Sequence, residues 1–335
     1  MTINWTKYHS VIMDAQRILL TTHENPDGDG LGCETAFYEY LSGMGKECRI
    51  INVSPFPVEY DFLNPDNRFE IYDKEKHTKW LSGVDIAIIL DIGDYKRMDV
   101  LWNIVTKYNI PTMNIDHHPH LNHSPFTYDL VNIKAAATGE IIYDYLKNQY
   151  QVKMPIIIYD GIYTAIMTDT GSFRHNNTTV KCHEIAIDCI QNGIDYTGIY
   201  QKVYESHSRN RMELLGKILA NLHYENNGEL AWFVIDQDLL QSTQANKEDV
   251  DGFTDIVRTI RGVEVAVMIF QNEENFCRVN FRSKGKYVIG HTARSLGGGG
   301  HDMAAGAVVE GKLNEVIEKV LAATMESMDS QKNSK

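Results

Sequence analysis

The chain has 335 residues, of which 43% are hydrophobic and 23% charged, as is usual for a soluble globular protein with two domains. Asp and Glu number 45 against 32 Lys and Arg, which gives a formal net charge of −13 at pH 7. This balance argues against a surface that coats nucleic acid, because such a surface needs a basic face. It does not exclude a small anionic substrate, because bound divalent cations can invert the local field.

The five cysteines are scattered, without a CxxC pair or a zinc-finger spacing. Such a set is typical of reduced thiols in a cytoplasmic protein. No apolar run approaches the roughly 20 residues that span a bilayer, and the first ten residues lack the apolar core of a signal peptide. We therefore expect a cytosolic protein without a membrane partner.

The predicted elements of the first half alternate between helices and strands; they are helices over 4–16 and 34–41 and strands over 17–22, 49–53, 86–90 and 111–115. The run 86–90 is continuously apolar, as is typical of a strand buried on both faces of a parallel sheet. The segment 23–32 contains Pro and three Gly, so we expect it to be irregular. Helices are predicted to dominate 137–222.

The second half is predicted to form another α/β unit, with strands over 230–235, 263–270 and 276–281 and helices over 245–260 and 313–325. The expected fold class is therefore α/β, with an N-terminal, mainly parallel sheet flanked by helices and joined to a smaller C-terminal α/β substrate domain. The predicted boundaries are 1–195 for the first domain, 196–220 for a helical linker and 221–330 for the second domain.

Acidic and imidazole side chains recur at four points of the first half; they are His23 with Asp27 and Asp29, then Asp91, then Asp116-His117-His118, then Asp169-Thr170-Gly171. Three of these clusters, at His23, Asp91 and Asp116, begin where a predicted strand stops. In open α/β sheets, ligands bind outside the carboxyl ends of the strands. Oxygen and imidazole ligands without cysteine favour hard or borderline divalent metals. The pattern therefore predicts a metal-dependent hydrolase.

Each cluster also has a simpler structural explanation. Asp169 alone fits a helix N-cap equally well, and a lone His23 is more often a satisfied polar residue than a ligand. The run 27–30 also fits a tight turn, whereas a calcium loop is disfavoured because no Glu stands at the right offset. The side chains of the adjacent His117 and His118 should diverge, so that one binds metal and the other faces the substrate. The joint occurrence of all four clusters favours the metal site.

The order His-x3-Asp-x-Asp, Asp, Asp-His-His, Asp-Thr-Gly resembles the DHH phosphoesterase superfamily. In the second half, GGGGHDMAAG over 297–306 resembles the glycine-rich signature of the DHH-associated substrate domain. The run 169–174 with the later Asn-Thr-Thr over 177–179 is typical of the same two-domain group. The resemblance covers most of the chain, and the most similar subgroup is the nano-RNase and pAp-phosphatase type, a bifunctional oligoribonuclease.

The resemblance implies two divalent ions that share Asp91; their ligands are His23, Asp27 and Asp91 for the first and Asp29, His117, Asp169 and Asp91 for the second. His118 would contact the scissile phosphate, so His118 and Asp91 are the predicted catalytic residues. Mn²⁺ is the usual ion of the family, while the ligand types also admit Mg²⁺ or Co²⁺. The chain departs from the family at Gly30 and Cys33, where many relatives carry Ala and Ser; neither position is expected to be a ligand.

The glycines over 297–300 allow backbone N–H groups to converge on a phosphate, although a flexible loop is the alternative. The apolar residues after His301 suggest that this loop is anchored to a packed helix. Arg282 lies at a strand end, where Arg is usually solvated, and the resemblance alone raises it to a candidate for a distal phosphate. The predicted substrate contacts are Arg282, Ser283, Arg294, Gly298, Gly299, Gly300 and His301.

We therefore predict a hydrolase of ester bonds, an oligoribonuclease and 3′-5′-bisphosphate nucleotidase, acting on short RNA such as pApA and on pAp in a cleft between the domains. Local donors without a basic track fit short substrates better than long nucleic acid. Cyclic-di-AMP or another cyclic dinucleotide is the alternative substrate, and a manganese pyrophosphatase or a processive DNA exonuclease is less favoured. From a different class, a non-catalytic nucleotide-sensing protein is disfavoured by the complete ligand set. The sequence leaves open the substrate ranking, the cleavage polarity and a homodimer, which is common in the family.

Overall fold

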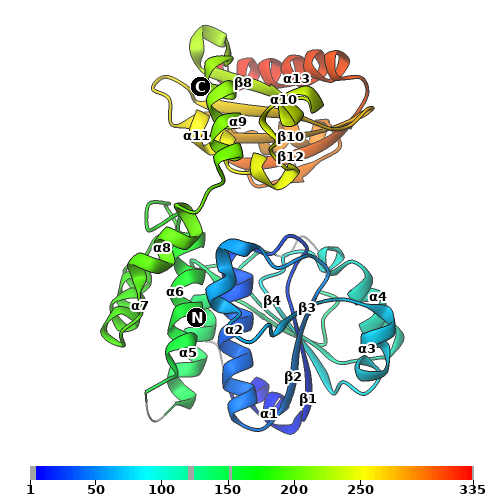
Figure 1. The fold of residues 1–335 in the computed structure, drawn as a ribbon, viewed down its shortest axis with the longest axis vertical. Coiled ribbons are helices and arrows are strands. Elements are labelled where there is room, and N and C mark those ends of the chain that lie inside the picture. The colour runs from blue at the N-terminus through cyan, green and yellow to red at the C-terminus, as the bar shows by residue number, and fades with distance from the viewer. Residues whose placement is uncertain (1–4, 120–123, 151–152, 334–335) are drawn as a thin grey trace. The chain divides into compact units, whose positions relative to one another are not determined.

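A computed structural model describes residues 5–119, 124–150 and 153–333. The chain divides into two compact units, Met1–Ser206 and His207–Lys335 (Figure 1). The segment 196–220, expected to be a helical linker, forms two helices that belong to different units. They are α8 (Tyr196–Tyr204) in the first unit and α9 (Arg209–Ala220) in the second.

The first unit is built on a six-stranded sheet in the order β3-β2-β1-β4-β5-β6, in which every strand pair is parallel. Its strands are β1 (Arg17–Thr21), β2 (Glu47–Asn52), β3 (Phe69–Ile71), β4 (Ile86–Leu90), β5 (Thr112–Asp116) and β6 (Tyr128–Val131). The strand order reverses between β1 and β4. Such a switch point opens a crevice outside the carboxyl ends of the strands, where ligands bind in this class of fold.

Helices cover both faces of this sheet (Figure 1). One face carries α2 (Gly28–Gly43), α5 (Thr138–Gln149), α6 (Ile156–Asp169) and α7 (Val180–Gln191), and the other carries α3 (Lys74–Leu81) and α4 (Val100–Lys107). The remaining elements of the unit are α1 (Trp5–Asp14), η1 (Val58–Leu63) and η2 (Tyr95–Met98). All five residues of β4 are buried, with alternate side chains in the two cores, as its apolar run predicts.

The expectation of an irregular segment over 23–32 is wrong from residue 28 onward, where α2 begins. Asp27 caps this helix, because its Oδ1 accepts from the backbone N–H groups of Asp29 at 3.0 Å and of Gly30 at 3.3 Å. The glycines serve packing as well as the turn. A Cβ on Gly32 would lie 2.2 Å from the carbonyl oxygen of Gly161, so glycine lets α2 and α6 meet backbone to backbone.

The second unit contains a six-stranded sheet in the order β11-β12-β10-β9-β8-β7. Its strands are β7 (His223–Glu225), β8 (Leu230–Ile235), β9 (Val265–Glu273), β10 (Phe276–Ser283), β11 (Gly299–Gly300) and β12 (Ala304–Glu310). The β8–β9 pair is parallel and the other pairs are antiparallel. One face packs against α9, α10 (Gln237–Thr243) and α11 (Phe253–Arg258), and the other against α12 (Gly290–Ser295) and α13 (Leu313–Asn333).

Two predictions for the second unit are wrong. The continuous helix over 245–260 is instead η4 (Lys247–Val250) followed by α11, because Gly252 between them has a φ of 80° that interrupts the helix. The residues from Ala304 onward form strand β12 instead of a packed helix, and they pair with β10. A short η3 (Asn226–Gly228) completes the unit.

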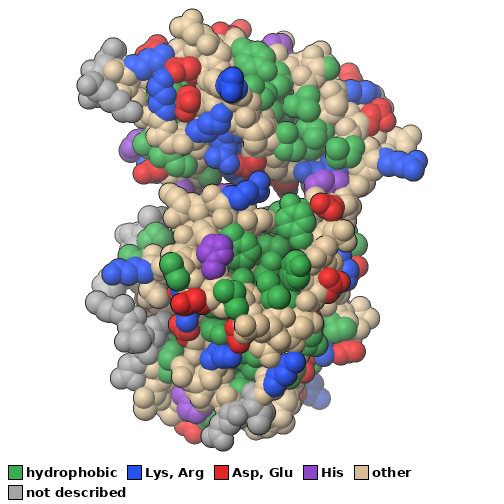
Figure 2. Space-filling view, turned by 90° about the vertical axis from the view of Figure 1, so that its left-hand side faces the viewer, with side chains coloured by type: hydrophobic (Ala, Val, Ile, Leu, Met, Phe, Trp, Pro, Cys, Tyr) green, Lys and Arg blue, Asp and Glu red, His purple; other side chains and the backbone are tan. Residues whose placement is uncertain are grey.

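Some charged side chains of the second unit form ion pairs. In its part of Figure 2, several Lys and Arg side chains lie beside Asp and Glu side chains. The ion pairs of this unit include Arg278 with Asp251 at 2.6 Å and Lys286 with Glu229. Among the residues that the structure describes, no helix has the length and apolarity needed to cross a membrane.

Candidate metal centre

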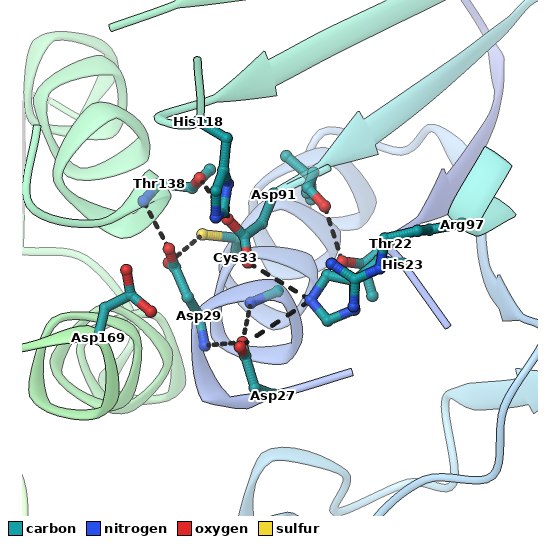
Figure 3. Close-up of polar contacts among 12 residues, drawn as sticks. Thr22, His23, Asp27, Asp29, Cys33, Asp91, Arg97, His118, Thr138 and Asp169 are labelled. Carbon is teal, nitrogen blue, oxygen red and sulfur yellow. Dashed lines mark hydrogen bonds and ion pairs between the residues drawn. The ribbon is translucent and has the colours of Figure 1, made fainter. Parts of the chain in front are cut away.

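Three neighbouring strands of the first sheet end in predicted ligands. His23 follows β1, Asp91 follows β4, and Asp116 ends β5 immediately before His117 and His118. Because β1, β4 and β5 are adjacent and parallel, their carboxyl ends meet at one edge of the sheet. Figure 3 shows the side chains of His23, Asp91 and His118 gathered at this edge.

Two helices supply the remaining predicted ligands. Asp27 is the N-cap of α2 and Asp29 lies in its first turn, while Asp169 is the last residue of α6. The alternative that Asp169 is a helix N-cap is therefore wrong. Because the close contact of α2 with α6 involves the residues just after Asp29, both carboxylates reach the same edge of the sheet (Figure 3).

The first donor set consists of His23, Asp27 and Asp91. Nε2 of His23 lies 3.9 Å from Asp27 Oδ2 and 3.7 Å from Asp91 Oδ2. His23 and Asp91 are buried, and Asp27 is exposed. One ligand atom from each residue lies within 4.8 Å of the others, which is close enough to share a cation.

The second donor set consists of Asp29, His117 and Asp169. Nε2 of His117 lies 3.1 Å from Asp169 Oδ2, 3.8 Å from Asp29 Oδ2 and 3.6 Å from Asp91 Oδ1. Among the described residues this buried nitrogen has no hydrogen-bond partner. On the other side of the ring, Nδ1 lies 3.3 Å from the carbonyl oxygen of Ala135. A proton on Nδ1 leaves the lone pair of Nε2 directed at the carboxylates, as a metal ligand requires.

Asp91 belongs to the first donor set and also lies beside the second. Its Oδ2 is directed at His23, and its Oδ1 lies near His117 and 3.4 Å from Nδ1 of His118. Burial opposes its ionisation, but hydrogen bonds from His118 and His23 hold the pKa of Asp91 well below its ordinary range. Its backbone has a φ of 58°, a left-handed conformation that is uncommon outside glycine and is often found at functional sites.

The residues present fit a divalent cation. Asp29 is completely buried, and burial together with repulsion from Asp91 and Asp169 raises its pKa well above the ordinary range. A divalent cation would remove that repulsion. Donor atoms around an ion with bonds of about 2.1 Å lie about 3 Å apart, and the closest pair here, His117 with Asp169, is 3.1 Å apart. Carboxylates and imidazoles without a thiolate suit Mn²⁺, Mg²⁺ or Co²⁺.

His118 is held by Asp116. Its Nδ1 lies 2.9 Å from Asp116 Oδ1, which also accepts from the backbone N–H groups of His117 at 2.7 Å and His118 at 3.0 Å. The expectation that the two imidazoles diverge is wrong, because Asp116 turns the chain and the ring centroids lie 4.3 Å apart. Burial disfavours the cation, but hydrogen bonds to Asp116 and Asp91 raise the pKa of His118 to about 11.

Two residues at the centre were absent from the sequence analysis. Arg97 Nη2 lies 2.7 Å from His23 Nδ1 and donates to the Glu24 carbonyl oxygen at 3.1 Å. The hydroxyl of Thr138 donates to Asp91 Oδ1 at 3.1 Å. An Arg six residues after Asp91, on the adjacent η2, was the available signal for Arg97. Thr138 had none, because its partner is 47 positions away in the sequence.

The predicted contacts on β10 have partners inside the second unit. Arg282 Nε lies 3.1 Å from Asp255 Oδ2, and Asp255 also pairs with Arg258 at 3.2 Å. The Arg282 side chain remains 29% exposed. Ser283 is buried, and its hydroxyl donates to the Tyr287 carbonyl oxygen at 2.5 Å. The structure therefore engages Ser283 internally and leaves Arg282 partly accessible.

The glycine run forms an edge of the second sheet instead of a flexible loop. Gly299 and Gly300 form β11, which pairs with β12. The backbone N–H of His301 donates to the Ala304 carbonyl oxygen at 2.8 Å, and its side chain is exposed. A Cβ on Gly290 would lie 3.0 Å from the carbonyl oxygen of His301 and 3.4 Å from Nη1 of Arg294, so these two predicted contacts lie close together.

Two family models and several known proteins match the chain. The family described as "DHH family, N-terminal domain" matches residues 17–168, and the DHHA1 domain matches residues 204–326. A bifunctional oligoribonuclease and PAP phosphatase NrnA from Thermus thermophilus is 27% identical over 324 residues, covering 93% of this chain and 90% of that protein. The protein of the same name from Bacillus subtilis is 30% identical over 297 residues, covering 87% and 89%.

Solved structures share the fold. An exopolyphosphatase-related protein from Bacteroides fragilis is 25% identical, with a TM-score of 0.91 and coverage of 97% of this chain and 96% of that one. RecJ from Thermus thermophilus in complex with Mn²⁺ is 12% identical, with a TM-score of 0.55 over 94% of this chain and 52% of that one, and shares the fold. The chain belongs to the DHH family.

Proposed function

We propose that this chain is a metal-dependent phosphoesterase that hydrolyses short oligoribonucleotides, such as pApA, and also pAp. The observation that carries the proposal is the pair of donor sets that meet at Asp91, at the switch point of the parallel sheet. Phosphoester hydrolysis is the chemistry of the DHH family, and the NrnA relatives carry the two substrates in their names.

The proposed ligands divide as the donor sets do; they are His23, Asp27 and Asp91 for one ion and Asp29, His117, Asp169 and Asp91 for the other. We infer two ions and favour Mn²⁺ for both. When bound, such ions supply Lewis-acid stabilisation of phosphoryl oxygens and activation of a water. The buried Asp91 links the two sets, because its Oδ2 faces His23 of one set and its Oδ1 faces His117 of the other.

His118 supplies a positive charge beside this centre. Asp116 and Asp91 hold its Nδ1 side, so Nε2 is the nitrogen that we assign to the scissile phosphate. With a pKa raised to about 11, the imidazole is protonated at neutral pH in the metal-free protein. A donor fixed in this way stabilises the charge that develops on a phosphoryl oxygen without reorganisation during the reaction.

The second unit is proposed to recognise a distal phosphate of the same substrate. Arg282 is the strongest candidate because its guanidinium is partly accessible and held in place by Asp255. The exposed side chain of His301 and the nearby Arg294 add donors, and the backbone from Gly298 to Gly300 offers an edge without side chains. The five free cysteines support the cytosolic location that belongs to this proposal. A homodimer stays a prediction.

A substrate panel tests the proposal. Purified full-length protein, stripped of metal and supplied with Mn²⁺, is incubated with pApA, pAp, cyclic-di-AMP and pyrophosphate, and the products are separated by chromatography. We expect turnover of pApA and pAp. Faster turnover of cyclic-di-AMP would move the activity to cyclic dinucleotides. Tight binding of nucleotides without turnover of any substrate would identify a sensor and overturn the enzymatic proposal.

A further inference from the structure

The segment from Ala135 to Gly139, which leads into α5, contacts three of the proposed metal ligands. Its first carbonyl group accepts from the ring of His117, as described above. Its last two backbone N–H groups donate to the carboxylate of Asp29, and the side chain of Thr138 donates to Asp91. None of these residues belongs to either donor set, so the segment acts on the centre through the ligands.

The contact with Asp29 uses the beginning of a helix. The backbone N–H of Thr138 donates to Asp29 Oδ2 at 2.6 Å, and that of Gly139 donates to Asp29 Oδ1 at 2.9 Å. The first N–H groups of a helix have no partner within the helix, and the helix dipole favours a negative charge there. Both oxygens of Asp29 are therefore held in one orientation by a chain segment about 110 residues away.

Gly139 permits this approach. A Cβ at this position would lie 2.5 Å from the Cβ of Ala165 on α6 and 3.5 Å from Asp29 Oδ1. Glycine therefore lets the beginning of α5 lie between α6 and the carboxylate. The segment is also tied to the ligand at the end of α6, because Asn177 Nδ2 donates to the carbonyl oxygens of both Ala136 and Asp169 at 3.1 Å.

Thr138 joins the two carboxylates. Its backbone N–H holds Asp29, and its hydroxyl donates to Asp91 Oδ1 at 3.1 Å (Figure 3). The same Asp91 oxygen also lies 3.6 Å from His117 Nε2. Thr138 is fully buried, so water does not provide another partner for the hydroxyl. The rotation of the Asp91 carboxylate is thereby coupled to the position of Asp29.

We propose that Thr138 is a positioning residue of the metal centre, which fixes the shared ligand Asp91 relative to Asp29 through one hydroxyl and one backbone N–H. The inference rests on the proposed function in taking Asp29 and Asp91 as ligands, and it deepens that proposal by identifying what orients them. Hydrogen bonds to metal ligands of this kind fix the geometry of a site and raise its affinity.

The experiment compares Thr138→Val with Thr138→Ser in the full-length protein. Valine removes the hydroxyl at nearly constant volume and keeps the backbone N–H, whereas serine keeps both. Mn²⁺ is titrated calorimetrically into metal-stripped protein, and thermal unfolding is recorded for each variant. We expect Thr138→Val to raise the Kd for Mn²⁺ by about 10–100-fold and Thr138→Ser to restore it.

Thr164→Val is the matched control. Thr164 is also fully buried in the first unit, but its hydroxyl donates to the Asp160 carbonyl oxygen at 2.7 Å within α6. This variant should leave the Mn²⁺ affinity unchanged even where it lowers the unfolding temperature. If Thr138→Val unfolds before the titration, Thr138→Ala removes the same hydroxyl without added bulk and is titrated in its place.

Two outcomes would overturn the inference: wild-type affinity in Thr138→Val, or a loss in Thr138→Ser as large as that in Thr138→Val. The readout requires no substrate. Weak Mn²⁺ binding in Thr138→Val together with an inactive wild-type protein would therefore overturn the proposed activity and support the positioning role. Wild-type Mn²⁺ affinity in Thr138→Val together with an active wild-type protein would overturn the positioning role alone.

Discussion

The two units differ in how firmly the fold holds the residues proposed for function. In the first unit, the proposed ligands come from three strand ends and two helix ends. Three of the six are buried, and the printed distances between their donor atoms are 3.1 to 3.9 Å. In the second unit, the proposed contacts are partly exposed side chains, such as Arg282, and the backbone of an edge strand. A reacting phosphorus needs fixed geometry, whereas recognition of a distal phosphate tolerates side chains that exchange one partner for another.

The largest effect is expected at the residue on which both donor sets depend. Asp91→Asn removes the charge but keeps a residue that tolerates a left-handed backbone, so the fold should persist. We expect kcat with pApA to fall by more than about 10³-fold, because a central electrostatic contact to the reaction is lost. Steady-state kinetics in Mn²⁺ check the fall in kcat, and circular dichroism checks that the fold persists.

Asp99→Asn provides the control for that substitution. Asp99 also has a positive φ, at 49°, and it is exposed between η2 and α4, outside the donor sets. Its substitution should leave kcat unchanged. If Asp91→Asn retained a substantial fraction of the wild-type rate, the shared-ligand role of Asp91 would be rejected.

A smaller effect, on binding rather than on rate, is expected from the second unit. Arg282→Ala should raise the KM for pAp and pApA by about 10-fold or more, since it removes a hydrogen bond to a charged group, and should leave kcat nearly unchanged. Arg278→Ala is the control, because Arg278 lies on the same face of β10 four residues earlier and pairs with Asp251. An unchanged KM in Arg282→Ala would remove this residue from substrate recognition.

The smallest effect is expected at Cys33, which contacts the proposed ligand Asp29 but is not itself a proposed ligand. Cys33 Sγ lies 3.4 Å from Asp29 Oδ1, so a serine at this position can donate to the same oxygen. Cys33→Ser should keep the Mn²⁺ affinity, and Cys33→Ala should weaken it by less than about tenfold, the range of one ordinary hydrogen bond. Cys189→Ala, at another buried cysteine, controls for lost packing. Equal affinities in the serine and alanine variants would show that Cys33 does not support Asp29.

Much of the first unit could be predicted because its signals are local. The apolar run before Asp91 marks a buried strand, and an acidic residue directly after it marks the edge where ligands gather. The start of α2 differs from the prediction because glycine is typical of turns, whereas Gly32 is needed here for contact with Gly161 on another helix. The role of Thr138 was equally invisible, because it depends on a partner 109 positions away.

In the second unit, the strands were predictable from alternating or continuous apolar residues. The exposure and the hydrogen-bond partners of the polar residues were not predictable. Arg282 and Ser283 are adjacent in the sequence, yet one side chain is partly exposed and the other is buried. This difference follows from the alternation of side chains along β10 and from the turn that the Ser283 hydroxyl holds. Which residue a turn buries depends on tertiary structure, which a sequence pattern does not specify.

The burial of Asp29 among other carboxylates has a consequence for the lifetime of the protein. A ligand that binds only the folded state raises the free energy of unfolding, by about 2.7 kcal/mol when it is present at 100 times its Kd. A cation that relieves the repulsion around Asp29 therefore protects the folded chain as well as enabling its chemistry. If the centre binds a cation as proposed, the protein would lose this protection when the metal supply falls and would open more often to proteases. The cell would then remove the inactive form preferentially, so that enzyme abundance follows metal supply.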